Sequence, residues 1–225
     1  MFKEINKKIN IIENLSQFKK NCGPCDRYAS FDYCFNYFQG FKNKSEIASP
    51  KNIQNSCLHL GFYLASWGML VRKSFLLQKS IKFYEPLIKY IASTECNVWN
   101  IDVSNYTDTN IELLIKCKEK IIDSLGCSNA KTWDTLVTKI MLGVFGNVPA
   151  FDTNFRTGSN LGTFNKHALQ EIYSFYNENK KIISDKATKI KTFEYDSGEA
   201  GNRFYTEAKI IDMIFFIEGD KKSGK

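Results

Sequence analysis

Histidine is scarce in this chain of 225 residues, which contains only His59 and His167. Neither histidine is paired in the sequence with a nucleophile, so catalysis by a histidine-activated serine or cysteine is not indicated. No apolar run approaches the roughly 20 residues that a membrane span requires. Residues 1–15 also lack the continuous apolar centre of a signal peptide. We therefore expect a soluble cytoplasmic protein that is not bound to a membrane.

Internal repeats and long linkers are also missing, so nothing in the sequence divides the chain. Apolar residues make up 43% and aromatic residues 14% of the composition, which is enough for a hydrophobic core and argues against extensive disorder. We expect a single α-helical domain over residues 1–220 and a flexible charged tail over residues 221–225. The sequence does not fix the oligomeric state.

The net charge of +7 has two explanations. A positive surface is compatible with DNA or another anionic partner. The chain is also rich in Lys, Asn, Ile, Phe and Tyr together, as expected of an AT-rich coding sequence, and such a bias raises the lysine content without any partner. The net charge alone therefore does not decide whether the protein has a basic binding surface.

The seven cysteines are odd in number and scattered, as expected of free thiols in a reducing cytoplasm. Cys22-Gly23-Pro24-Cys25 has the spacing of a redox-active pair, but that chemistry requires a preceding strand, and a helix is predicted here. Cys22, Cys25 and Cys34 could also contribute to a zinc site, although no second ligand pair with suitable spacing follows. No cofactor is expected, and metal binding by these cysteines is left open.

Apolar residues recur with a helical period along most of the chain. This pattern predicts an all-α fold of eight or nine helices. One short β-hairpin is added near residues 192–206, where aromatic residues flank a glycine-rich centre. Residues 60–70 are apolar nearly all round and are expected in the central buried helix. The helices are predicted over residues 2–19, 26–40, 49–71, 74–93 with a kink or a new start at Glu85-Pro86, 109–125 after a capping box at Thr109, 130–144, 165–183 and 207–218.

The stretch from Asp123 to Gly162 contains the strongest candidate for a functional site. Asp152 lies in the segment Pro-Ala-Phe-Asp-Thr-Asn-Phe, where a turn leads into a helix. An aspartate there serves as an N-cap, because its side chain accepts hydrogen bonds from the first helical N–H groups. The same carboxylate, with Lys139 and Arg156 nearby in the sequence, can be directed at a developing positive charge.

The order of residues in this stretch resembles that of the helix-hairpin-helix DNA glycosylases of base-excision repair. A glycine turn at Gly126 joins two predicted helices, Phe145-Gly146 ends the second, and the segment Phe151–Phe155 contains the aspartate. Leu161-Gly162 follows, as in the family. The hairpin departs from the family pattern, because it lacks the proline and has Ser128 in place of the second glycine.

The resemblance implies a DNA-binding protein that hydrolyses the N-glycosidic bond of a damaged or modified base turned out of the duplex. Asp152 would be the catalytic carboxylate, and Lys131 would correspond to the lysine that forms a Schiff base in some members. An aromatic such as Trp67 or Trp99 could stack on the base. Contacts to DNA phosphates are assigned to Gly126, Ser128, Lys139, Arg156 and Lys166.

The departures in the hairpin keep an alternative open. The chain could be a non-catalytic helical protein that binds nucleic acid or a protein partner, as defence and toxin-type proteins do. The aromatic content suits a protein interface as well as it suits a core.

Overall fold

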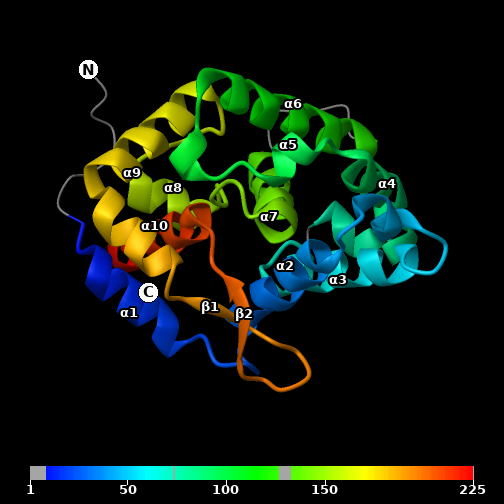
Figure 1. Cartoon of the computed structure of the whole chain (residues 1–225), viewed down its shortest axis with the longest axis horizontal. Helices are drawn as coiled ribbons and strands as arrows, with labels where there is room; N and C mark the ends of the chain where they lie inside the picture. Colours follow the sequence, from blue (N-terminus) through cyan, green and yellow to red (C-terminus); the bar gives the residue numbers. More distant parts are fainter. Residues whose placement is uncertain (1–8, 73, 127–132, 225) are drawn as a thin grey trace.

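The computed structural model describes residues 9–72, 74–126 and 133–224. These residues form ten α-helices, several short 3₁₀ turns and one antiparallel pair of strands, which confirms the predicted all-α fold with a short hairpin (Figure 1). None of the described helices is long and apolar enough to cross a membrane. The elements are α1 (Ile11–Lys20), α2 (Ser30–Gly40), α3 (Ile53–Ser66), α4 (Glu85–Ser93), α5 (Cys96–Trp99), α6 (Asp108–Ser124), α7 (Asp134–Phe145), α8 (Thr153–Ser159), α9 (Lys166–Ala187), β1 (Lys191–Phe193), β2 (Ala200–Phe204) and α10 (Glu207–Ser223).

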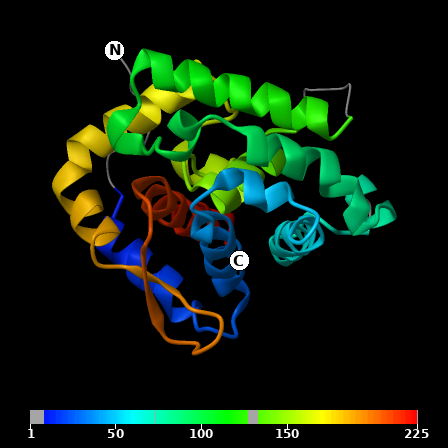
Figure 2. The ribbon, with the colours of Figure 1, turned by 45° about the vertical axis from the view of Figure 1, so that its right-hand side comes forward.

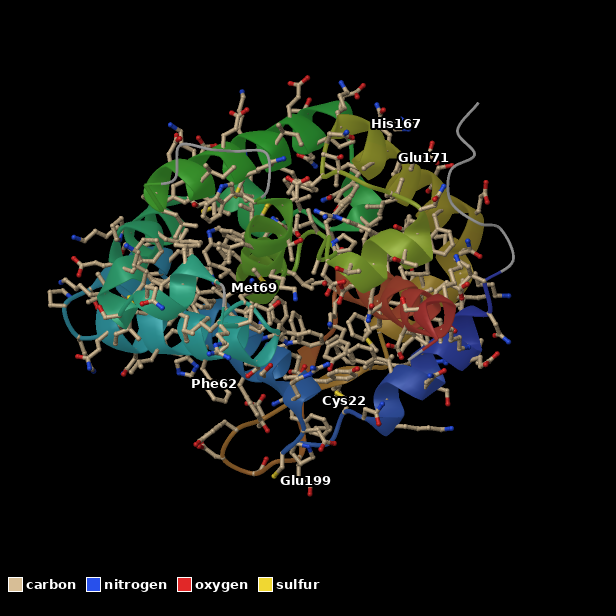
Figure 3. The ribbon with its side chains drawn as sticks, turned by 180° about the vertical axis from the view of Figure 1, so that it is seen from behind. Cys22, Phe62, Met69, His167, Glu171 and Glu199 are labelled. Atoms are coloured by element: carbon tan, nitrogen blue, oxygen red, sulfur yellow. The ribbon has the colours of Figure 1, made fainter. Side chains whose placement is uncertain are left out.

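The central buried helix is α7, whereas the sequence predicted that residues 60–70 would lie in the central buried helix. Every residue of α7 except Thr135 is buried, and the helix contacts α2, α3 and α6 (Figure 1). By contrast, α3 has an outer face on which Phe62 is 70% exposed and points away from the helix (Figure 3). Apolar composition did not distinguish the two helices, because α3 exposes some of its apolar side chains. Burial of α7 on all sides fixes its position relative to the helices around it.

Helices α8 and α10 cross at a backbone-to-backbone contact made possible by two glycines. A methyl group at Gly158 would collide with the backbone of Phe215, and one at Gly219 would collide with the backbone of Asn154. Helix α10 also contacts α1 and α9. The short helix α8 is therefore held against a long helix that is itself packed on two others, which positions the start of α8.

The hairpin of β1 and β2 lies beside α2 (Figure 2), and polar side chains of α2 fasten it there. The Phe193 N–H donates to the carboxylate of Asp32 at 2.9 Å, and the Asn36 side chain donates to the Phe193 carbonyl at 2.9 Å. The predicted hairpin near residues 192–206 thus forms one residue earlier than its predicted start and is part of the compact body.

Several predicted boundaries shift for identifiable reasons. Helix α3 ends at Ser66, before Gly68 takes a φ of +75°. Pro86 occupies the first turn of α4, so a new helix starts at Glu85, which was one of the two predicted outcomes. Thr107, not Thr109, caps α6. Helix α10 continues to Ser223, five residues beyond its predicted end at Glu218.

Two buried carboxyl groups fasten elements that are distant in sequence. Asp102 accepts hydrogen bonds from the N–H groups of Glu207 and Ala208 at the start of α10. Asp32 accepts from the Tyr205 hydroxyl at 2.7 Å, in addition to its bond with the hairpin. Burial raises the pKa of Asp102 to about 7 and the pKa of Asp32 to about 6. Both groups therefore take up protons in the folded protein at a higher pH than in the unfolded chain.

We expect the free energy of unfolding to decrease as the pH rises from about 4 to about 7. A carboxyl group with a raised folded-state pKa stabilises the fold fully below its unfolded pKa, and this contribution is lost as the pH rises through its folded pKa. The slope is limited to about 1.4 kcal/mol per pH unit for each group. Urea denaturation at a series of pH values measures it. Asp32→Asn should reduce the slope below about pH 6, and an unchanged slope in this variant would contradict the assignment.

Candidate functional site

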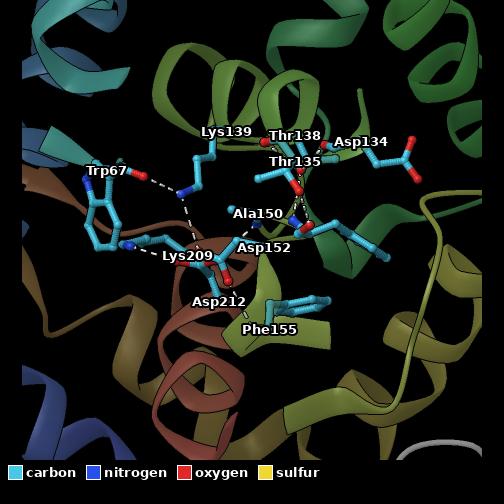
Figure 4. Close-up of polar contacts among 11 residues, drawn as sticks. Trp67, Asp134, Thr135, Thr138, Lys139, Ala150, Asp152, Phe155, Lys209 and Asp212 are labelled. Carbon is cyan, nitrogen blue, oxygen red and sulfur yellow. Dashed lines mark hydrogen bonds and ion pairs between the residues drawn. The ribbon is translucent and has the colours of Figure 1, made fainter. Parts of the chain in front are cut away.

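The turn between α7 and α8, which carries Asp152, is fixed by side chains from two helices (Figure 4). Three side chains form hydrogen bonds with the backbone of Ala150 or Phe151, and these bonds hold the turn in one conformation. This is the arrangement expected where a reactive group must be oriented before its partner arrives. The bonds run from the Ala150 N–H to Asp212 Oδ1 (3.0 Å), from the Phe151 N–H to Thr138 Oγ1 (2.8 Å) and from the Thr135 hydroxyl to the Phe151 carbonyl (2.9 Å).

Asp152 is the N-cap of α8, as the sequence predicts. Its Oδ1 accepts a hydrogen bond from the Phe155 N–H at 3.0 Å, and its Oδ2 lies 3.5 Å from Lys139 Nζ. The side chain is 15% exposed. One carboxylate oxygen therefore stabilises the helix start, while the other forms an ion pair and stays near solvent.

Lys139, which the sequence assigned to a phosphate contact, is almost completely buried. It projects from the buried helix α7, its side chain is 6% exposed, and its Nζ donates to the Trp67 carbonyl at 2.7 Å. Burial lowers the pKa of Lys139, and the neighbouring Asp152 carboxylate opposes this effect. Lys139 is instead the cation beside the candidate carboxylate.

Asp152 and Lys139 border hollows on two sides. Towards the surface lies an open pocket of about 260 Å³, whose lining includes Arg27 and Asn154. Towards the core lies a narrower cavity of about 10 Å³, about the space that one water molecule needs. The residues that line both are Trp67, Lys139, Asp152 and Phe216. The ion pair thus separates an accessible pocket from a small polar cavity.

Trp67 belongs to the pocket, whereas Trp99 does not. The Trp67 ring stacks on Tyr28 with centroids 5.2 Å apart, and the Arg27 guanidinium lies 5.6 Å from its centroid. Trp99 is buried against Phe145 and lines neither hollow. The suggested stacking role is therefore geometrically available to Trp67 only, and Tyr28 already covers part of the indole.

Of the other residues expected to contact DNA, the three that the structure describes, Gly126, Arg156 and Lys166, do not line this pocket. Gly126 ends α6 with a φ of +64° and is exposed, as a turn glycine should be. Lys166 forms an ion pair with Asp108 at 3.1 Å. Arg156 lies on α8 with a buried Nε that has no hydrogen-bond partner. Ser128 and Lys131 lie outside the described residues.

Three charged residues of the site were missed by the sequence analysis, namely Arg27, Lys209 and Asp212. The last two form an ion pair of 2.8 Å behind the turn, on the helix that reads as apolar from the sequence. Their spacing of three inside that apolar helix was a usable signal, because charges there must face one another or be exposed. Arg27 gave no comparable local signal.

The cysteines do not form a metal or redox site in the described part of the chain. Cys22 follows the C-terminal end of α1 (Figure 3), and burial raises the pKa of its thiol, whereas a reactive thiol needs a lowered pKa. Cys34 is buried in the core. Among the residues described, no group of three or more Cys, His, Asp or Glu side chains is placed to hold a metal ion.

Chemically, the pocket combines a fixed carboxylate, a buried lysine, an aromatic wall and an exposed arginine. Such a set can bind a small planar or charged group and stabilise positive charge that develops on it. Comparison of the chain with protein families, with curated proteins and with solved structures found no match.

Proposed function

We propose that the protein binds DNA and hydrolyses the N-glycosidic bond of a damaged or modified base that is turned out into the pocket at Asp152. One observation carries the proposal. The Asp152 carboxylate, at the start of α8, lines an open pocket of about 260 Å³ next to Lys139 and Trp67. The pocket is slightly smaller than those of drug-sized ligands, which suits a single nucleobase.

The mechanism assigns separate roles to the two charged groups. The bond between the sugar and the base nitrogen breaks, and its electron pair leaves with the base. Asp152 stabilises the positive charge that develops on the sugar and takes a proton from the water that adds to it. The lowered pKa of Lys139 favours donation of a proton from its ammonium group to the departing base. Lys131 remains a candidate from the sequence alone.

The fixed turn supports this mechanism energetically. Electrostatic groups accelerate a reaction most when they do not have to reorganise during it. Because the backbone of Ala150 and Phe151 is held by side chains of α7 and α10, the carboxylate has little freedom to move. A short polar turn without these bonds would offer no such advantage.

A second candidate function is favoured by the ion pair itself. Both oxygens of Asp152 already have partners, Phe155 N–H and Lys139, so the carboxylate can be fully explained as a structural group. In that case the chain is a non-catalytic helical protein that binds nucleic acid or another protein through the same pocket. The two candidates differ in whether a base is released.

Salt dependence tests the DNA-binding part of the proposal. We expect the affinity for a 20-base-pair duplex to fall at least roughly tenfold between 50 and 200 mM salt, because each phosphate contact releases bound counterions. Fluorescence anisotropy of a labelled duplex measures this. Arg27→Gln should weaken binding and reduce the salt slope, since Arg27 is an exposed cation that lines the pocket. Affinity that does not change with salt would exclude the phosphate contacts.

Base release is then assayed with the same duplexes. The protein is incubated with a panel of duplexes that each contain one damaged or modified base, and abasic sites are detected by alkaline strand cleavage. Release from at least one duplex, lost in Asp152→Asn, supports the glycosylase. DNA binding without release from any duplex supports the non-catalytic alternative.

A further inference from the structure

Behind the turn that carries Asp152, helix α10 contains an ion pair that is almost completely buried. Lys209 is 1% exposed and Asp212 is 5% exposed, and Lys209 Nζ lies 2.8 Å from Asp212 Oδ2. Three aromatic rings lie close to the ammonium group of Lys209. Their centroids lie at 5.0 Å (Phe18), 4.7 Å (Phe31) and 5.2 Å (Trp67) from Nζ.

Stability does not by itself account for such a pair. Removing two charges from water costs several kcal/mol per ion, and well-packed apolar residues in their place are often equally stable or better. Cation–π contacts recover part of this cost. The placement of the pair matters more, because Asp212 Oδ1 accepts the Ala150 N–H at 3.0 Å, two residues before Asp152. Both members of the pair also line the narrow cavity next to Lys139.

We propose that Asp212 is a positioning residue of this site, which fixes the turn before Asp152 and supplies the second negative charge that keeps Lys139 an ammonium ion, while Lys209 balances that charge in the core. The inference rests on the proposed function only in treating Asp152 and Lys139 as the reacting groups. Asp212 itself does not reach the open pocket, whose lining residues do not include it.

The electrostatics around Lys139 agree with this role. Burial lowers the pKa of Lys139, Asp152 and then Asp212 oppose the shift, and Arg27 reinforces it. Burial and the Asp152 carboxylate raise the pKa of Asp212, whereas the Lys209 ammonium and the Ala150 N–H favour its charged form and oppose that rise. The ionisable side chains that face Lys139 come from four parts of the fold, namely Arg27 before α2, Tyr63 of α3, Asp152 at the start of α8, and Lys209 and Asp212 of α10.

The test is a titration of the lysine side chains by ¹⁵N NMR in the full-length protein, where ammonium and amine nitrogens have different chemical shifts. The Lys139 signal is assigned from its loss in Lys139→Arg. Asp212→Asn retains an acceptor for the Ala150 N–H but removes the charge, so we expect the titration midpoint of Lys139 to fall by about one pH unit. Asp212→Glu keeps the charge and should leave the midpoint near the wild-type value.

Asp134→Asn is the matched control. Asp134 also pairs with a lysine, Lys118 at 2.6 Å, and also accepts a backbone N–H, that of Phe164 at 2.8 Å, but it lines neither hollow. Its substitution should leave the Lys139 midpoint unchanged. A purely structural role would predict that Asp212→Glu, which is longer, disturbs Lys139 at least as much as Asp212→Asn does.

The outcomes separate this inference from the proposed function. Equal midpoints in wild type and Asp212→Asn, or an equal shift in the control, overturn the positioning role whether or not any base is released. If Asp212→Asn does not fold, the wild-type titration decides, and a Lys139 that is already an amine at pH 7 overturns the inference. The base-release assay of Asp152→Asn tests the proposed function alone, and its result does not depend on the titration of Lys139.

Discussion

Asp152→Asn is expected to reduce the rate of base release by about 10²- to 10³-fold, which corresponds to roughly 3–4 kcal/mol of transition-state stabilisation. The substitution removes the negative charge that faces the pocket, and the asparagine oxygen can still accept the Phe155 N–H, because asparagine is as good an N-cap as aspartate. The fold should therefore survive while the chemistry is lost. Single-turnover kinetics on the duplex with the fastest release measure the change.

The same substitution at Asp134 provides the control for this experiment. Asp134 lies in the first turn of α7, is more deeply buried than Asp152 and forms a shorter ion pair. Asp134→Asn should cost at least as much stability, yet at a temperature where both variants are folded its rate should stay within about threefold of wild type. A similar loss of rate in both variants would mean that Asp152 acts only through the fold.

Duplex affinity distinguishes the two candidate functions in the same variants. A carboxylate that acts on a developing charge contributes little to ground-state binding, so the dissociation constant of Asp152→Asn should change less than about threefold. If Asp152 instead belonged to a non-catalytic binding surface, neutralising it would leave Lys139 without its closest anion. DNA binding would then change in Asp152→Asn, and the wild-type protein would release no base.

The parts of the fold and of the site that the sequence predicted are those that depend on local chemistry. The N-cap role of Asp152, the glycine that ends α7 and the hairpin near residues 192–206 each follow from a few adjacent residues. Short-range hydrogen bonding and backbone conformation decide such features, and they leave recognisable residue types. The glycosylase resemblance was drawn from the same kind of information and remains a prediction.

The parts that the sequence did not predict depend on contacts between distant segments. Trp67 and Lys139 meet only because α3 ends against α7. They are 72 positions apart in the sequence, and Asp212 is 62 positions from Ala150. Helical periodicity places Lys139 on a helix, but it does not show whether other parts of the chain cover that helix on every side. Lys139 was therefore predicted as a contact to a DNA phosphate, and the packing of α7 buries it at the pocket.

The crossing of α8 and α10 gives the largest expected effect on stability. We expect Gly219→Ala to reduce the free energy of unfolding by about 3 kcal/mol or more, which for a chain of this size is a decrease in Tm of roughly 6–12 °C. The added methyl group would collide with the carbonyl group of Asn154 in α8. Because that obstacle is backbone, it cannot rotate away, and α8 must move as a unit. Thermal and urea denaturation followed by circular dichroism measure the loss.

Gly40→Ala gives the opposite expectation from the same chemical change. Gly40 ends α2, is exposed, and has no atom within 4 Å of the position that a Cβ would take. Helix propensity then favours alanine, so this variant should be as stable as wild type or up to about 1 kcal/mol more stable. Equal stability of Gly219→Ala and Gly40→Ala would refute the close crossing. A large loss of stability in Gly219→Ala but not in Gly40→Ala would link α10 to the start of α8. It would thus link α10 to the position of Asp152, since the segment that must shift begins at Thr153.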